Sequence, residues 1–289
     1  NSPEISDLVI YIDTNKLPIN YSKKNYLLLI EPPSVLPNNF LKKNHKYFNK
    51  IFTWKDDLVD NKKYFKMHFS FDLKRKYDPK KIKDKFCVMI TRKKFSSYHN
   101  EAYSIRYKII QWFNRNKRNK FDLYGYDWDS FLFKKFPFTF FNRFKIIKKI
   151  LHYFFEAKLE VYKGELLSKF DVLPSYKFCI CYENIYDIEG YITEKLFDCF
   201  FSRTVPVYLG AINVEKFIPG NCFIDGRKFK TPKELYNQIS SIGIKEYNEY
   251  IESIENFLVS DKSEVFDSAY NSKLIVNEIL FRQSLETDG

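Results

Sequence analysis

Two stretches of this chain each alternate a strand, a helix and a second strand, and this pattern constrains the fold more than any other feature. The strands are short apolar runs, and the residues between them repeat apolar side chains at helical spacing. The first unit comprises residues 85–91, 100–114 and 121–124, and the second comprises 176–182, 193–201 and 205–209. Such β-α-β units predict parallel sheets, in which ligands bind at the carboxyl ends of the strands.

Glycine usage narrows the class of α/β protein. The chain of 289 residues has 8 Gly, and none precedes Gly125. Neither the GxGxxG dinucleotide loop nor the GxxxxGK[ST] phosphate loop is present, which argues against a classical Rossmann oxidoreductase and a P-loop NTPase. Apolar residues make up 45% of the chain and aromatic residues 19%, so intrinsic disorder is excluded.

The first part of the chain predicts a second α/β unit. Residues 7–12, 25–30 and 51–54 are apolar runs of strand length between loops rich in Lys and Asn. We therefore expect one domain over residues 1–79, a second over 80–264, and a C-terminal helix within 265–289 that packs back on the first domain.

Charge is unevenly distributed along the chain. Residues 1–158 have 34 Lys/Arg and 15 Asp/Glu, a net charge of +19, whereas the remainder has a net charge of −7. The segment from Phe131 to Lys158 contains seven Lys/Arg, one Glu and many Phe. Either this segment is an amphipathic helix on an anionic membrane, or it is a core-facing helix whose outer face is covered by lysine.

Two features of the sequence bear on the cellular compartment of the protein. The sequence contains neither an apolar run of 18 residues nor a signal-peptide pattern. The five cysteines are odd in number and lack metal-ligand spacing, which favours buried thiols in a reducing compartment. We expect a cytoplasmic protein, with peripheral binding to the inner face of a membrane as an open alternative.

Residues 182–196, YENIYDIEGYITEKL, contain the densest group of candidate site residues. Glu183 and Asn184 end a predicted buried strand, and Thr193, Glu194 and Lys195 begin the next helix. A helix N-terminus attracts phosphate, a Lys adds a full charge, and a Glu can accept two hydrogen bonds from a ribose. The alternative is an ordinary helix start with a Thr cap. The group suits a sugar nucleotide.

Residues 169–229 resemble the signature of the α1,3/1,4-fucosyltransferases, glycosyltransferase family ten. Many fixed positions occur in order over about 60 residues, so the resemblance is specific. The matching positions are Tyr176-Lys177-Phe178, Tyr182-Glu183-Asn184, Gly190-Tyr191-Ile192-Thr193-Glu194-Lys195, Val205-Pro206-Val207 with Gly210, and Phe223-Ile224. The resemblance implies the GT-B fold, in which two Rossmann-like α/β domains face each other across a cleft. Family members carry more chain at the beginning, so we expect a shortened N-terminal domain.

The resemblance also assigns the donor-binding residues. Arg106 and Lys195 are expected to bind the donor diphosphate, Glu194 and Tyr191 to hold the ribose and adjacent groups, and Asn184 to lie near the sugar or phosphate. Glu183 and Thr193 are further candidates.

Residues 27–31 resemble the strand of the family that ends in Gly-Glu-Asn, and the Glu of that motif is the proposed general base of the family. In this chain the corresponding residue is Glu31, with Ile30 in place of the Gly and Pro32 in place of the Asn. The family implies transfer of L-fucose from GDP-fucose, with inversion, to a hydroxyl of an oligosaccharide or glycoconjugate, in α1,3 or α1,4 linkage. A relative that uses another GDP-sugar remains an alternative within this class.

Metal involvement is expected to be minor. Asp127 and Asp129 form a D-x-D pattern, with which other glycosyltransferases hold a divalent metal. The family resembled here neutralises the diphosphate with Arg and Lys, so we expect no metal site, no required cofactor, and at most stimulation by Mn2+ or Mg2+.

The alternative function from another class is a non-catalytic basic protein that binds a membrane or nucleic acid. That alternative leaves the motif at residues 182–195 unexplained, so we expect no nucleic-acid partner.

Overall fold

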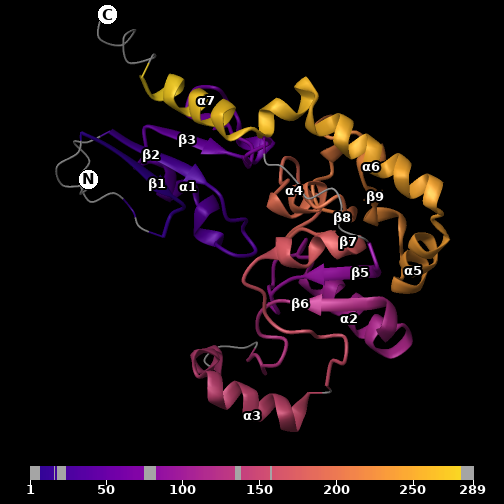
Figure 1. Ribbon diagram of the computed structural model, residues 1–289. Coiled ribbons are helices and arrows are strands. Elements are labelled where there is room, and N and C mark those ends of the chain that lie inside the picture. The colour runs from indigo at the N-terminus through magenta and orange to yellow at the C-terminus, as the bar shows by residue number, and fades with distance from the viewer. Residues whose placement is uncertain are drawn as a thin grey trace, which may run out of the picture.

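The computed structural model describes residues 7–15, 17, 24–74, 83–133, 138–156 and 158–280, and these form two parallel β-sheets (Figure 1). The first sheet has the strand order β1-β2-β3-β4, and the second has the order β6-β5-β7-β8-β9. Both β-α-β units predicted from the sequence are confirmed and lie in the second sheet.

The first sheet comprises β1 (Leu8–Ile12), β2 (Lys24–Leu29), β3 (Lys50–Thr53) and β4 (Tyr64–Lys66). The strand β4 has only three residues and was not predicted. One face packs against the C-terminal helix α7 (Ser268–Leu280), whose Ile279 is buried with the sheet residues Tyr26 and Phe52. Leu27 and Ile51 point to the other face and pack on Phe48, just after the short helix α1 (Lys42–His45). Figure 1 shows α7 running along the first sheet.

The second sheet contains the larger core. Its strands are β5 (Lys85–Ile90), β6 (Phe121–Tyr124), β7 (Tyr176–Tyr182), β8 (Val205–Leu209) and β9 (Ile224–Asp225). Its helices are α2 (Tyr103–Asn116), α4 (Glu194–Phe201), α5 (Pro232–Ser241) and α6 (Ile244–Leu258). α2 packs on α5 through Phe113 and Tyr236, and α4 packs on α6 through Phe200 and Phe257. All five cysteines are free and buried, as the sequence predicted.

Part of the predicted domain organisation falls on residues that the structure does not describe. The domain boundary predicted at residues 79 and 80, and residues 281–289 of the predicted C-terminal segment, lie outside the described residues. In the described part of the basic segment from Phe131 to Lys158, the α-helix α3 (Lys145–Phe155) projects from the second sheet (Figure 1). Among the described helices, none is both long enough and apolar enough to cross a membrane.

The two sheets are joined by a junction that contains both apolar contacts and hydrogen bonds. Trp54, which follows β3, is buried with Tyr191, and their ring centroids are 4.7 Å apart. Asn213 donates to Asp56 (2.8 Å) and accepts from the backbone N–H of Gly190 (2.9 Å). The loop that leads into α4 is therefore fixed against the first sheet.

We expect Gly190→Ala to destabilise this junction. Gly190 has φ +82°, and an added Cβ would lie 2.1 Å from the backbone oxygen of Trp54. The free energy of unfolding should fall by about 2 to 4 kcal/mol, because both the backbone conformation and the close contact are incompatible with a side chain. Chemical denaturation followed by circular dichroism measures this change. Gly243→Ala is the control, since nothing lies within 4 Å of its added Cβ. Equal stability of the two variants would contradict the close contact.

Candidate functional site

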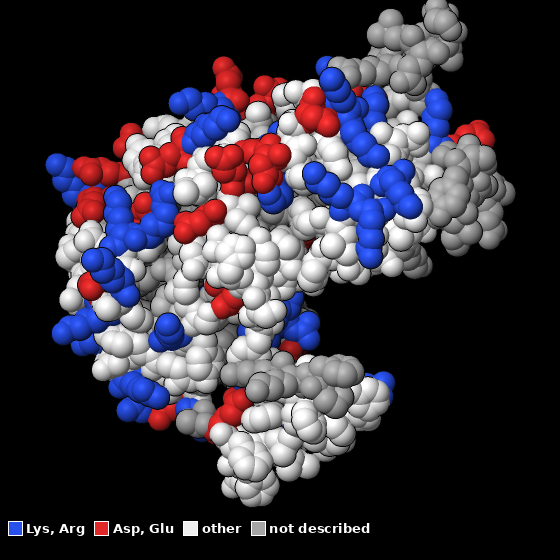
Figure 2. Space-filling model, turned by 180° about the vertical axis from the view of Figure 1, so that it is seen from behind, with Lys and Arg blue, Asp and Glu red and all other residues white. Residues whose placement is uncertain are grey.

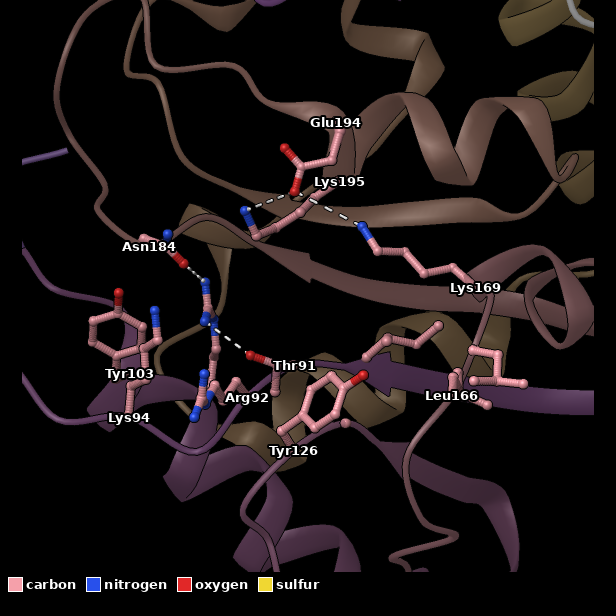
Figure 3. Close-up of a pocket in the computed structure, with 14 residues that line it drawn as sticks. Thr91, Arg92, Lys94, Tyr103, Tyr126, Leu166, Lys169, Asn184, Glu194 and Lys195 are labelled. Atoms are coloured by element: carbon pink, nitrogen blue, oxygen red, sulfur yellow. Dashed lines mark hydrogen bonds and ion pairs between the residues drawn. The ribbon is translucent and has the colours of Figure 1, made fainter. Parts of the chain in front are cut away.

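A cavity of about 410 Å3 opens at the carboxyl ends of β5, β6 and β7 (Figure 3). This edge is where an open α/β sheet binds its ligands. Its lining includes five cations and one anion, together with Asn184, Tyr103 and Tyr126. The charged residues are Arg92, Lys94, Arg106, Lys169, Lys195 and Glu194. The cavity therefore has the size and the positive charge that suit a ligand with a diphosphate.

Lys195 is held in the cavity wall by the buried carboxylate of Glu183. The ammonium of Lys195 lies 3.0 Å from Glu183, which is 0% exposed. Thr193 donates both its backbone N–H (2.8 Å) and its hydroxyl to the same carboxylate. Burial lowers the pKa of Lys195, but the Glu183 and Glu194 carboxylates raise it more, so its pKa lies above the ordinary value. Lys195 is thus a fixed, fully charged group.

Two amides at the start of α4 are already occupied. The N–H of Thr193 donates to Glu183, and the N–H of Lys195 donates to the Thr193 hydroxyl (3.4 Å). These two N–H groups are therefore engaged by the protein itself, and phosphate binding at this helix N-terminus stays a prediction. In this structure Thr193 caps the helix, and the charge that faces the cavity comes from side chains.

Arg106 lies on α2 and is fixed by three acceptors from neighbouring strands. Its guanidinium donates to the Thr91 hydroxyl (3.0 Å), to the Tyr182 carbonyl (2.5 Å) and to the Asn184 side-chain oxygen (3.2 Å). Desolvation lowers the pKa of Arg106 from its usual value, but a guanidinium remains charged at any working pH. Arg106 and Asn184, which were predicted separately as donor-binding residues, are therefore in contact at the cavity.

Glu194 lies between two ammonium groups at the rim of the cavity. Lys195 is 3.7 Å from its carboxylate and Lys169 is 3.8 Å away (Figure 3). Burial raises the pKa of Glu194, but Lys195 and Lys169 lower it more, so the pKa lies below its ordinary value. Its carboxylate is therefore ionised and can accept hydrogen bonds from a ligand.

Glu31 lies just after β2, and its backbone position is fixed by a buried polar network. The carboxylate of Asp13 accepts from the N–H groups of Ile30 (2.8 Å) and Glu31 (3.1 Å). Asn39 donates to Asp13 (2.6 Å) and to the Glu31 carbonyl (2.9 Å). The turn after β2 is thus fixed by Asp13 and Asn39, in addition to the prolines that follow it.

The electrostatic partners of Glu31 include residues of the cavity wall. Burial raises the pKa of Glu31 above its ordinary value, and Lys94 and then Lys195 oppose this rise. Lys94 and Lys195 both line the cavity, but Glu31 is not among the lining residues. Glu31 is therefore close enough to the cavity to interact with its cations, from the side of the first sheet.

Three predicted site residues, Glu183, Tyr191 and Thr193, are buried and do not line the cavity. Tyr191 packs against Trp54 at the junction of the sheets, and its hydroxyl accepts a hydrogen bond from Asn184 (3.5 Å). Glu183 is enclosed by Thr193 and Lys195. Tyr191 and Glu183 position other residues: Tyr191 lies behind Asn184, and Glu183 holds Lys195. Contact between Tyr191 and the donor stays a prediction.

The sequence analysis did not identify several polar residues of the cavity wall, among them Arg92, Lys94, Tyr103, Tyr126 and Lys169. Lys169 begins the stretch that resembles the family, and it forms an ion pair with Asp198 (2.7 Å). Arg92 and Lys94 follow β5 directly, at the edge where ligands of such sheets bind. Their position after a predicted strand was the signal that could have identified them.

The two aspartates of the D-x-D pattern are occupied by cations of the protein. Asp127 accepts from Arg92 (2.7 Å) and Lys148 (2.6 Å), and Asp129 lies 3.3 Å from Lys149. The described residues contain no group of three or more His, Cys, Asp or Glu side chains placed to hold a metal ion.

Part of this chain matches a known family. The family model described as "Glycosyltransferase family 10 (fucosyltransferase) C-term" matches residues 156–274. The Alpha-(1,4)-fucosyltransferase of Arabidopsis thaliana is 43% identical over 71 residues, which are 25% of this chain and 18% of that protein. The Alpha-(1,3)-fucosyltransferase FucT of Helicobacter pylori is 38% identical over 72 residues, which are 25% of this chain and 15% of that protein. The chain thus aligns with less than a fifth of the length of these curated relatives.

Solved structures show the same fold over most of the chain. An α1,3-fucosyltransferase with GDP-fucose superposes with a TM-score of 0.53 and 18% identity, covering 90% of this chain and 80% of that one. Anabaena HepE in complex with UDP superposes with a TM-score of 0.55 and 10% identity, covering 89% and 72%. The predicted GT-B fold is confirmed. Residues 156–274 thus match glycosyltransferase family 10, the fucosyltransferase family, and the relatives that align with this chain are fucosyltransferases.

Proposed function

We propose that this protein transfers L-fucose from GDP-fucose to a hydroxyl group of a glycan. The observation that carries the proposal is the convergence of five cations on one cavity at the carboxyl ends of β5, β6 and β7, in a chain whose residues 156–274 match the family model of glycosyltransferase family 10. Relatives that match this chain are named as fucosyltransferases, and a structure with the same fold was solved with GDP-fucose.

Lys195 and Arg106 have the placement needed to stabilise the leaving GDP. Negative charge grows on the diphosphate as the bond to the sugar breaks, and fixed cations stabilise that charge without reorganising. Lys195 is held by Glu183, and Arg106 is held by Thr91 and Asn184. Lys169 and Arg92 add positive charge to the same cavity. In this proposal Glu194 accepts the ribose hydroxyls.

Glu31 is the proposed general base. It approaches the cavity from the first sheet, whereas the nucleotide side of the cavity is built from the second sheet. A base on the side opposite the leaving group can take the acceptor proton while the acceptor oxygen attacks, and a single attack of this kind inverts the anomeric carbon. Burial raises the pKa of Glu31, which strengthens it as a base as long as it remains ionised.

The acceptor is proposed to be an oligosaccharide or glycoconjugate, joined in α1,3 or α1,4 linkage. The two curated relatives described above are named for these two linkages. We expect no required metal, because the cavity supplies cations of its own.

A panel of GDP-sugars tests the proposal. The chain should release GDP from GDP-fucose faster than it releases GDP from GDP-mannose or UDP from UDP-glucose, and the rate should persist in excess EDTA. Preference for another GDP-sugar would establish the alternative donor. A rate lost in EDTA and restored by Mn2+ would contradict the metal-free site.

We expect Lys94→Met to move the acidic limb of the rate profile to higher pH. Lys94 lowers the pKa of Glu31 against the effect of burial, so its removal raises that pKa further. The base acts in its ionised form. With a higher pKa, Glu31 becomes protonated at a higher pH, so activity is lost at a higher pH as the solution is made more acidic. The measurement is kcat/KM for transfer between about pH 4.5 and 8. Lys108→Met, on the exposed side of α2, is the control. An acidic limb that stays in place would show that Lys94 does not act on the base.

A further inference from the structure

Helix α3 turns a charged side toward the protein and an apolar side outward, the reverse of a helix that packs on a core. Lys148 is its buried residue, and the Lys148 ammonium lies 2.6 Å from the Asp127 carboxylate on the body of the protein. On the same side, the buried Lys93 forms an ion pair with Glu156, and His152 lies 3.1 Å from Glu156. Charged side chains therefore fasten α3 to the protein.

The outward side of α3 is apolar. Ile146 is 77% exposed, Tyr153 82%, Phe154 70% and Phe155 72%. Phe140, in the turn before the helix, is also exposed and contacts Phe144. An exposed apolar surface of this kind marks an interaction site, because isolated apolar side chains are common on proteins but clusters are not. Of the two alternatives that the sequence left open for this segment, the core-facing helix with a lysine-covered outer face does not describe α3.

We propose that the outer face of α3 binds the surface of an anionic lipid bilayer. Two exposed cations, Arg143 and Lys145, lie beside the apolar side chains, and Arg143 stacks 3.1 Å from the centre of the Phe140 ring. A helix with this combination lies in the interface of a bilayer, with its apolar side chains among the acyl chains and its cations at the headgroups. The segment from Phe131 to Lys158 has a net charge of +6, so anionic lipids complement it.

The shape of this region favours a bilayer over a second copy. α3 lies on a lobe that projects from the second sheet, and Figure 2 shows that lobe, at the bottom, with a largely uncharged surface below a hollow (Figures 1 and 2). A convex apolar surface can insert into lipid without a matching groove. Two copies placed face to face would bring the cations of α3 together, which opposes association.

Binding at α3 would also orient the donor cavity. Asp127 accepts from both Lys148 of α3 and Arg92 of the cavity wall. The helix is therefore connected to the cavity through one carboxylate. A membrane-bound α3 holds the cavity close to the lipid surface.

Vesicle sedimentation tests the proposal. The intact chain is mixed with vesicles of phosphatidylcholine and phosphatidylglycerol (70:30) or of phosphatidylcholine alone. It should bind the anionic vesicles, more weakly as salt is raised, and bind the neutral vesicles at least tenfold more weakly. Ile146→Ser/Phe154→Ser and Arg143→Gln/Lys145→Gln should each weaken binding at least tenfold. Ile244→Ser/Val259→Ser is the matched control, because Ile244 and Val259 are 73% and 87% exposed at the ends of α6.

Three results would overturn the proposal. They are no binding of the wild type to anionic vesicles, equal binding of the α3 variants and the control, and a wild-type dimer in light scattering that the Ile146→Ser/Phe154→Ser change dissociates. Unchanged melting of every variant establishes that the exposed substitutions leave the fold intact. GDP affinity, measured on the same samples, is independent of this proposal. Vesicle binding without GDP binding would overturn the proposed function alone.

Discussion

Glu31→Gln should lower kcat for fucose transfer by about 10² to 10⁴, because the amide has the size and hydrogen bonds of the carboxylate but cannot accept the acceptor proton. The backbone around Glu31 is fixed by Asp13 and Asn39, and the substitution leaves that network unchanged. GDP affinity should change by less than a factor of about 3, since Glu31 is not among the residues that line the donor cavity.

Steady-state kinetics and GDP titration measure these two quantities. Glu252→Gln is the matched control, an exposed carboxylate on α6 that should have no effect on either. A near-normal kcat for Glu31→Gln would remove Glu31 from the mechanism. Loss of GDP affinity in the same variant would instead place Glu31 on the nucleotide.

Lys195→Met should lower kcat/KM for GDP-fucose by about 10² to 10³, the usual effect of removing one fixed group that stabilises a developing anion. The same substitution should also destabilise the protein, by about 3 to 5 kcal/mol, because it leaves the buried carboxylate of Glu183 without its cation. Activity alone therefore cannot assign Lys195 to the donor.

A double variant separates the two effects. Glu183→Gln/Lys195→Met removes both charges, so the free energy of unfolding should recover most of the loss, while kcat/KM stays low. Denaturant titration of both variants measures the stability, and transfer assays measure the activity. Recovery of activity together with stability would mean that Lys195 acts only within the fold.

Much of the second sheet could be predicted from the sequence because its signals are local. The run Tyr176–Tyr182 is apolar on both faces, as a central parallel strand must be, and Thr193 is a helix cap. The order of motifs from β7 to α4 placed Asn184, Glu194 and Lys195 at one edge of the sheet, and the cavity contains all three.

The remaining site depends on contacts between distant segments, which the sequence does not show. Tyr191 lies in the same sequence motif as Lys195, but its side chain is buried because Trp54, next to the first sheet, packs on it. Lys94 becomes a site residue because its loop after β5 lines the cavity near Glu31. The orientation of α3 depends on Asp127, which pairs with the one lysine that faces inward.

The most direct test of the account is calorimetric titration of the intact chain with GDP and with GMP in EDTA. The cations of the cavity predict one GDP site, with GMP at least tenfold weaker because it lacks the second phosphate, and with GDP binding reduced at least tenfold in Glu183→Gln/Lys195→Met. Equal affinity for GDP and GMP, or GDP binding that survives in the folded double variant, would contradict the assignment of this cavity to the diphosphate of the donor.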